Sequence, residues 1–79
     1  MRKVRIYGMV IFWKSNRKSL RISFVDIKNP HNRGDIEIDY KDGISEEDIK
    51  DAIAREKAID KDNIEIAKHI LPNLPLKES

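Results

Sequence analysis

The sequence predicts a small α+β domain in which three antiparallel strands, one helix and a fourth strand follow one another along the chain. Three observations support this prediction: apolar and polar residues alternate through the first half, an amphipathic segment with a capping signal covers residues 46–58, and a last alternation ends at a proline. The chain has 79 residues, enough for one domain. We expect a single domain over residues 1–71, an antiparallel meander with the helix packed on one sheet face, and a flexible tail over residues 72–79.

The first expected strand covers residues 2–13 and is apolar on both faces. Successive side chains of a strand point to opposite sides of the sheet, so each face needs its own cover. The parity that we assign to the core contains Val4, Ile6, Val10 and Phe12. The opposite parity contains Tyr7, Met9, Ile11 and Trp13. One helix can cover only the first set, so the second set is predicted to lie on an outer face.

Two turn regions separate the first three strands. Residues 14–19 are polar and lack glycine, which favours a longer hairpin loop over a two-residue turn. The second strand is expected over residues 20–28, and a turn with a proline and a glycine follows it. The third strand, residues 36–41, alternates apolar and charged positions, so it should have one solvated face.

A helix is expected over residues 46–58. Ser45 precedes three acidic residues, and a serine N-cap with acids in the first turn suits the positive end of the helix dipole. The stripe that should face the sheet consists of Ile49, Ala52 and Ile53, with Ile59 as a further candidate. A fourth strand is expected over residues 63–70, because apolar residues alternate again there until a proline stops the strand.

The outer sheet face gives the main indication of function. Its predicted apolar side chains are Tyr7, Met9, Ile11, Trp13, Val25 and Ile27. Contiguous apolar surfaces on small proteins often mark interfaces. We therefore interpret the chain as a small non-enzymatic regulatory protein, an inhibitor or adaptor of the kind that phages also make, which binds a larger protein through this face. A homodimer through the same face is one alternative, and a tail that folds back over it through Leu74 and Leu76 is another.

Charge is unevenly distributed along the sequence. Residues 1–34 carry a net charge of +8, and the remaining residues carry −6. Pairing of basic and acidic strands across the sheet is one explanation. The other is a binding surface on the basic, aromatic hairpin 12–21, which contacts a protein partner or, as the alternative function, nucleic acid. The basic residues of this hairpin are Lys14, Arg17, Lys18 and Arg21.

Two short patterns resemble families that handle nucleic acids. Asp26, together with Asp39 and Lys41, resembles the acid and acid-x-lysine pattern of the restriction-nuclease-like superfamily, in which the acids bind Mg²⁺. Strand parity points Asp26 away from Asp39, so we interpret these carboxylates as solvated. Residues 41–49 are similar to the helix entry of PC4-like single-strand-binding proteins, a resemblance that implies nucleic-acid binding and assigns no site residues.

Composition argues against several other classes of protein. The chain has no cysteine and only three glycines, so neither a thiolate metal site nor a phosphate-binding loop is expected. His31 and His69 are far apart in the sequence, and no cofactor or metal ion is predicted. The N-terminal apolar run is too short and too charged to span a bilayer, so we expect a cytoplasmic protein without membrane contact.

Overall fold

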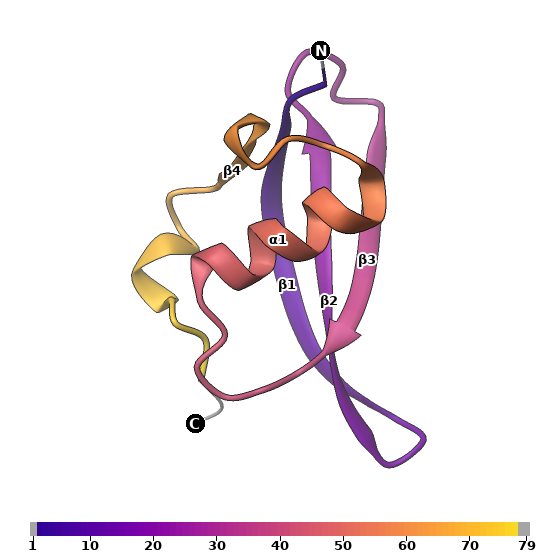
Figure 1. Cartoon of the computed structure of the whole chain (residues 1–79), viewed down its shortest axis with the longest axis vertical. Helices are drawn as coiled ribbons and strands as arrows, with labels where there is room; N and C mark the ends of the chain where they lie inside the picture. Colours follow the sequence, from indigo (N-terminus) through magenta and orange to yellow (C-terminus); the bar gives the residue numbers. More distant parts are fainter. Residues whose placement is uncertain (1, 78–79) are drawn as a thin grey trace.

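The computed structural model describes residues 2–77 and shows one four-stranded sheet with a single α-helix (Figure 1). The strands are β1 (Val4–Lys14), β2 (Arg17–Asp26), β3 (Arg33–Asp39) and β4 (Ile64–Ile66), and the helix is α1 (Glu46–Lys57). Two 3-10 turns, η1 (Lys61–Asn63) and η2 (Leu71–Asn73), lie on either side of β4 in the sequence. This element order confirms the predicted α+β class. No described helix has the length and apolar character that a membrane crossing requires.

The sheet has the strand order β3-β2-β1-β4. The first three strands form the predicted antiparallel meander, and β4 pairs with β1 in parallel. The segment that contains α1 therefore carries the chain from one edge of the sheet to the other, across a single face (Figure 1). β4 is shorter than predicted, because Ala67 still donates to the Ile6 carbonyl at 2.9 Å but Ile70 then donates back to Ala67 in a turn.

A β-bulge in β1 reverses the alternation of its side chains. Ile6 pairs with Phe24 and Gly8 pairs with Ser23, so Tyr7 and Gly8 together oppose one residue of β2. One extra residue in a strand shifts every later side chain to the other face. The β1 residues that pack into or against the core, before and after the bulge, are Val4, Ile6, Met9 and Ile11.

The predicted faces of β1 are therefore wrong beyond the bulge. Met9 and Ile11, expected on the outer face, pack against the core. Val10 and Phe12, expected in the core, follow the outer parity, and Val10 is 59% exposed. One apolar stripe of β1 thus lies on the helix side of the sheet, both before and after the bulge.

The β1–β2 hairpin ends in a two-residue turn, not in the longer loop that we predicted. Lys14 pairs with Arg17, and the two residues between them, Ser15 and Asn16, have positive φ angles of 49° and 68°. This backbone matches the twist of antiparallel strands, and asparagine adopts it more readily than most residues. The tip of the hairpin extends past the layer formed by α1 (Figure 1).

The N-terminus of α1 confirms the predicted cap. The Asp48 backbone N–H donates to the Ser45 hydroxyl at 3.3 Å, and the Ser45 N–H donates to the Asp48 carboxylate at 3.1 Å. The bond from the Ser45 backbone, together with that from its side chain, lowers the pKa of Asp48. The predicted stripe is also confirmed, since Ile49, Ala52 and Ile53 are buried. They cover a sheet face whose fully buried side chains are Val4, Ile6, Leu20, Ile22 and Phe24.

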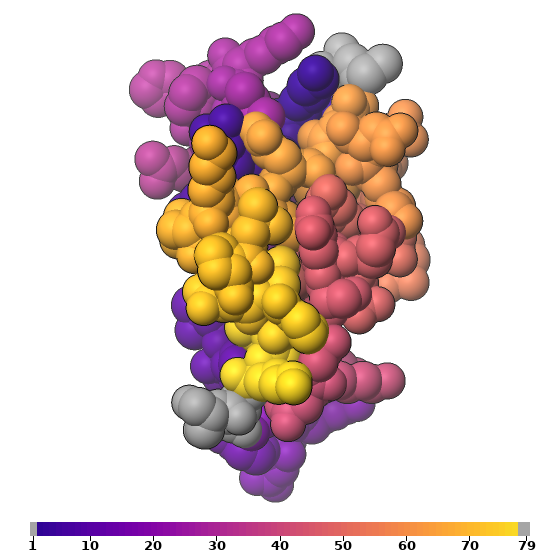
Figure 2. All heavy atoms as spheres, turned by 90° about the vertical axis from the view of Figure 1, so that its left-hand side faces the viewer, coloured from indigo at the N-terminus to yellow at the C-terminus, as the bar shows by residue number. Residues whose placement is uncertain are grey.

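The C-terminal segment lies on the helix side of the sheet. Leu74 and Leu76 pack against the core, and the Leu76 backbone accepts from Gly43 at 2.8 Å and donates to Ile44 at 2.7 Å. Figure 2 shows this segment, in yellow, beside the first turns of α1. The alternative in which Leu74 and Leu76 cover the outer face is therefore wrong. The domain boundary at residue 71 and the flexibility of residues 72–79 stay predictions, and residues 78–79 lie outside the described part.

Candidate functional site

The sheet face opposite α1, the outer face, carries a group of exposed apolar side chains. Tyr7 and Val10 are 40% and 59% exposed, and Phe12 and Val25 are half-buried. We call these four residues the outer patch. The described α1 and C-terminal segment both lie on the other side of the sheet (Figure 1). The outer patch therefore faces solvent.

Two arginine side chains lie over the aromatic rings of the outer patch. The Arg21 guanidinium lies 5.1 Å from the centre of the Phe12 ring, and Arg33 lies 6.0 Å from that of Tyr7. Each such contact contributes about 0.5–1 kcal/mol at an exposed site. Beside Tyr7, a hollow of about 330 Å³ is lined by this tyrosine with Val25, Pro30 and Arg33. The patch thus offers aromatic rings beside arginine side chains, next to a concave surface.

The six predicted apolar site residues do not lie together. Tyr7 and Val25 are on the outer face, whereas Met9 and Ile11 pack on the helix side. Trp13 shares the parity of Met9 and Ile11 but lies beyond the helix layer, where it is 68% exposed and has the Lys18 ammonium 5.4 Å from its ring. The sixth residue, Ile27, follows the end of β2 and lines a separate hollow near β4.

Sequence reasoning missed Val10 and Phe12 as outer residues. The signal that could have found them is Gly8, since a glycine inside an otherwise apolar strand often marks a bulge. No steric need for glycine exists there, because a Cβ on Gly8 would have no neighbour within 4 Å. The glycine is thus compatible with the bulge without being required by close packing.

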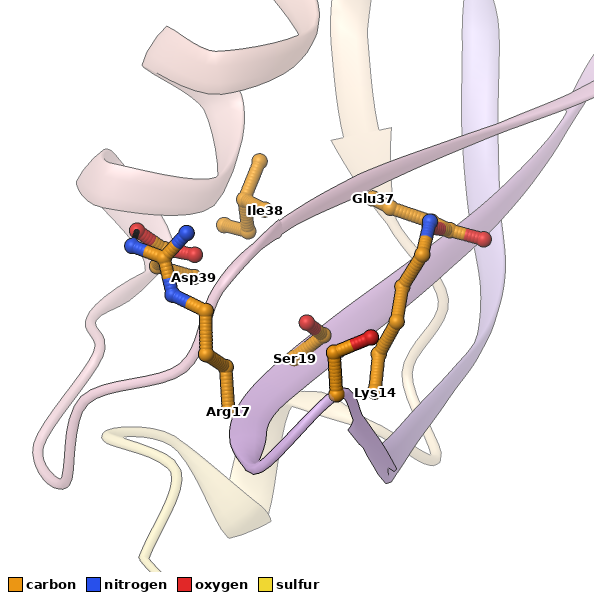
Figure 3. A pocket seen from close by; sticks show the side chains of 7 residues that line it. Lys14, Arg17, Ser19, Glu37, Ile38 and Asp39 are labelled. Carbon is orange, nitrogen blue, oxygen red and sulfur yellow. Dashed lines mark hydrogen bonds and ion pairs between the residues drawn. The ribbon is translucent and has the colours of Figure 1, made fainter.

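Three cations of the basic hairpin are paired with acids of β3. Lys14 and Arg21 lie 3.2 and 3.1 Å from the Glu37 carboxylate, and Arg17 lies 3.6 Å from Asp39. Figure 3 shows the two ion-paired groups on opposite sides of a hollow, with Ser19 between them. Pairing across the sheet therefore accounts for these three cations and for part of the uneven charge distribution.

These ion pairs change the acidity of the carboxyl groups. Hydrogen bonds from Arg21, and then from Lys14, lower the pKa of Glu37. A hydrogen bond from Arg2 at 2.7 Å lowers the pKa of Asp26. Partial burial opposes the shift in both cases but does not reverse it.

We expect the free energy of unfolding to decrease as the pH falls below about 4. A carboxyl with a lowered folded-state pKa contributes stability above its unfolded-state pKa, and this contribution is lost as the pH falls through the folded-state value. Glu37→Gln should therefore flatten the acid decrease measured by urea denaturation between about pH 7 and 3. Glu56→Gln, at an exposed position of α1, is the control. Equal slopes for Glu37→Gln and the unmodified protein would contradict the ion-pair assignment.

The residues that resemble a nuclease pattern are not brought together. Asp26 faces Val4 at one end of β2, and Asp39 faces Ser19 near the other end. Across residues 2–77, no group of three or more histidines and acids could hold a metal ion. His69 is occupied with the backbone, since its Nε2 lies 3.2 Å from the Tyr7 carbonyl.

The outer face is a surface of exposed and half-buried side chains. It combines apolar side chains, two arginine-covered rings and a rim of paired charges. Compared with known proteins, the chain matches no family model, no curated protein and no solved structure.

Proposed function

We propose that this chain is a non-catalytic binding domain that attaches to a larger protein through the outer patch. In this proposal it acts as an inhibitor or adaptor, because its bound surface covers or redirects the partner. The observation that carries the proposal is the row formed by the exposed Tyr7 and Val10 and the half-buried Phe12, with Arg21 and Arg33 over its two aromatic rings. Tyrosine and arginine are among the residues that contribute most to protein interfaces.

The charges around the outer patch favour a protein partner over nucleic acid. Binding to nucleic acid depends on cations that neutralise phosphates. Here Lys14, Arg17 and Arg21 already contact carboxylates of β3, and phosphates would have to compete with these. A rim of mixed charge around apolar side chains is typical of protein interfaces.

Nucleic-acid binding remains the second candidate on one specific observation. Lys18 lies against the Trp13 ring, and Arg21 lies against the Phe12 ring. A cation beside an exposed aromatic ring is also how single-stranded nucleic acids are held, by stacking and by phosphate contact. The experiment below therefore includes an arm for nucleic acid.

To test the proposal, the tagged full chain is used to capture partners from cell lysate treated with nuclease, and each captured protein is purified and titrated. We expect Tyr7→Ala to weaken the captured complex by about thirtyfold, equivalent to about 2 kcal/mol, because truncation of a central interface aromatic has effects of this size. Arg33→Ala should weaken it as well. Glu56→Ala, on α1 and away from the outer face, should leave the affinity unchanged.

Two outcomes would overturn the proposal. One is a partner whose affinity is the same for Tyr7→Ala and the unmodified chain. The other is capture that disappears with nuclease treatment and reappears as retardation of purified DNA or RNA, with an affinity that falls linearly with log salt. The second outcome would establish the nucleic-acid alternative.

A further inference from the structure

The second half of β1 forms an open edge of the sheet. β4 pairs only with Val4, Arg5 and Ile6, although β1 continues to Lys14. In the part of the chain that the structure describes, no strand adjoins β1 on this side after Ile6. Figure 2 looks onto this side of the molecule, and violet atoms of the β1–β2 hairpin are visible beside and below the yellow C-terminal segment.

The hairpin turn determines which backbone groups point out of this edge. In a two-residue hairpin the residues that flank the turn, Lys14 and Arg17, form a hydrogen-bonded pair. Every second residue of β1 back from Lys14 then also bonds to β2. The Tyr40 N–H donates to the Lys18 carbonyl at 3.0 Å, on the side of β2 away from β1. Lys18 is the residue opposite Trp13, so this bond agrees with an alternation in which Trp13 does not bond to β2. The β1 residues whose N–H and C=O point toward the open edge are Met9, Ile11 and Trp13.

The composition of this edge is unusual for an unprotected strand. Residues 8–13 carry no charge, and Val10 and Trp13 are more than half exposed. Edge strands of monomers are normally protected by charged residues, prolines or a covering element. The opposite edge strand, β3, has such protection, because acids occupy every second position at Asp35, Glu37 and Asp39.

We propose that the β1 edge pairs with the β1 edge of a second copy of this chain, antiparallel, about a twofold axis at Ile11. This register joins Ile11 to its own counterpart and Met9 to Trp13 of the second copy. It uses all three residues with outward backbone groups and no others. Registers centred one residue earlier require Tyr7, whose carbonyl already contacts His69, and those centred one residue later require the turn residue Ser15.

Side chains of the two copies are complementary in this register. Val10 lies opposite Phe12 of the second copy at a position without backbone bonds, where opposing side chains approach most closely. Trp13 lies opposite Met9 on the helix side. An isologous contact repeats each of these pairs by symmetry. The pairing places no carboxylate in the contact and extends the sheet continuously across both copies.

The dimer depends on the β1 edge and not on the proposed partner, so each proposal can fail alone. It is tested by sedimentation of the full chain over a concentration series, combined with amide hydrogen exchange. We expect a concentration-dependent dimer in which the amides of Met9, Ile11 and Trp13 become protected. Trp13→Ala should weaken dimerisation by about thirtyfold, equivalent to about 2 kcal/mol.

Lysine substitutions at the β1 edge and away from it test whether this edge forms the dimer contact. Val10→Lys should abolish the dimer, because it places an ammonium opposite Phe12 of the second copy. Ile27→Lys makes the same kind of change at an apolar, exposed position away from the edge and should leave the dimer intact. The chain has no cysteine, so mixing Val10→Cys and Phe12→Cys chains should give a disulfide-linked heterodimer even if Val10→Lys fails to fold.

Two results would overturn this inference. The first is a chain that stays monomeric up to about 1 mM, which corresponds to less than about 4 kcal/mol of association. The second is a dimer in which the amides of Met9, Ile11 and Trp13 exchange as fast as in the monomer. That dimer would form by stacking of the outer faces instead.

Discussion

We expect Ile53→Asp to unfold the domain. Ile53 is fully buried in the middle of α1, against the sheet. The substitution removes apolar contacts whose loss costs about 2–5 kcal/mol and adds a carboxylate without a partner, which costs several more. A domain of this size has a total stability of only about 5 kcal/mol. Circular dichroism in buffer should therefore show an unfolded chain.

The control for this prediction is Arg55→Asp on the same helix. Arg55 is exposed, and an acid near the helix C-terminus should cost no more than about 1 kcal/mol. This variant should give the spectrum of the unmodified protein. A folded Ile53→Asp chain with cooperative thermal unfolding would mean that α1 does not pack on the sheet as described.

Ending the chain after Asn73 should lower the free energy of unfolding by about 3–5 kcal/mol. The truncation removes Leu74 and Leu76, each partly buried against the core, and the two backbone hydrogen bonds between Leu76 and residues 43–44. Apolar burial contributes about 1 kcal/mol for each half-buried leucine, and each hydrogen bond contributes about 0.5–1.5 kcal/mol. Urea denaturation of the two chains measures the difference.

A shorter truncation and the fluorescence of Trp13 are the controls for this experiment. A chain that ends at Leu76 keeps these contacts and should be as stable as the full chain. The fluorescence of Trp13 should have the same emission maximum in all three chains when they are monomeric, because this side chain is already 68% exposed. A shift to longer wavelength on truncation would contradict the exposure of Trp13 in the full chain.

Local signals allowed the helix to be predicted closely. Ser45 followed by acids defined its first turn, and Ile49, Ala52 and Ile53 defined its buried face, because capping and helical periodicity act within a few residues. The meander could also be predicted from local signals, because alternating residues mark its strands and turn residues mark their ends. The short length of β4 could not, since β4 ends where Ile70 donates back to Ala67 in a turn that the alternation of residues does not indicate.

The candidate site was harder to predict, because the bulge lies in the middle of its main strand. Regular alternation assigned Met9 and Ile11 to the outside and Val10 and Phe12 to the inside, and the shift at Gly8 exchanges these two pairs. The alternation of residues in the sequence predicts the sheet face of each side chain only where the strand contains no bulge. The ion pairs between β2 and β3 were anticipated as one of two explanations for the charge distribution, but their specific partners depend on cross-strand register.

The difference between the two sheet edges sets a limit on assembly. Strands that can pair at both edges allow a sheet to grow without end, which is the geometry of fibres. In this chain β3 carries Asp35, Glu37 and Asp39 in a row, and two such rows facing each other would repel. If the β1 edges pair as proposed, the resulting dimer has a β3 strand at each end of its sheet, and the carboxylates of β3 oppose pairing of two such ends. Two of these carboxylates, Glu37 and Asp39, also pair with cations of the hairpin. The same residues that balance the charge of the hairpin would therefore limit such a sheet to two copies.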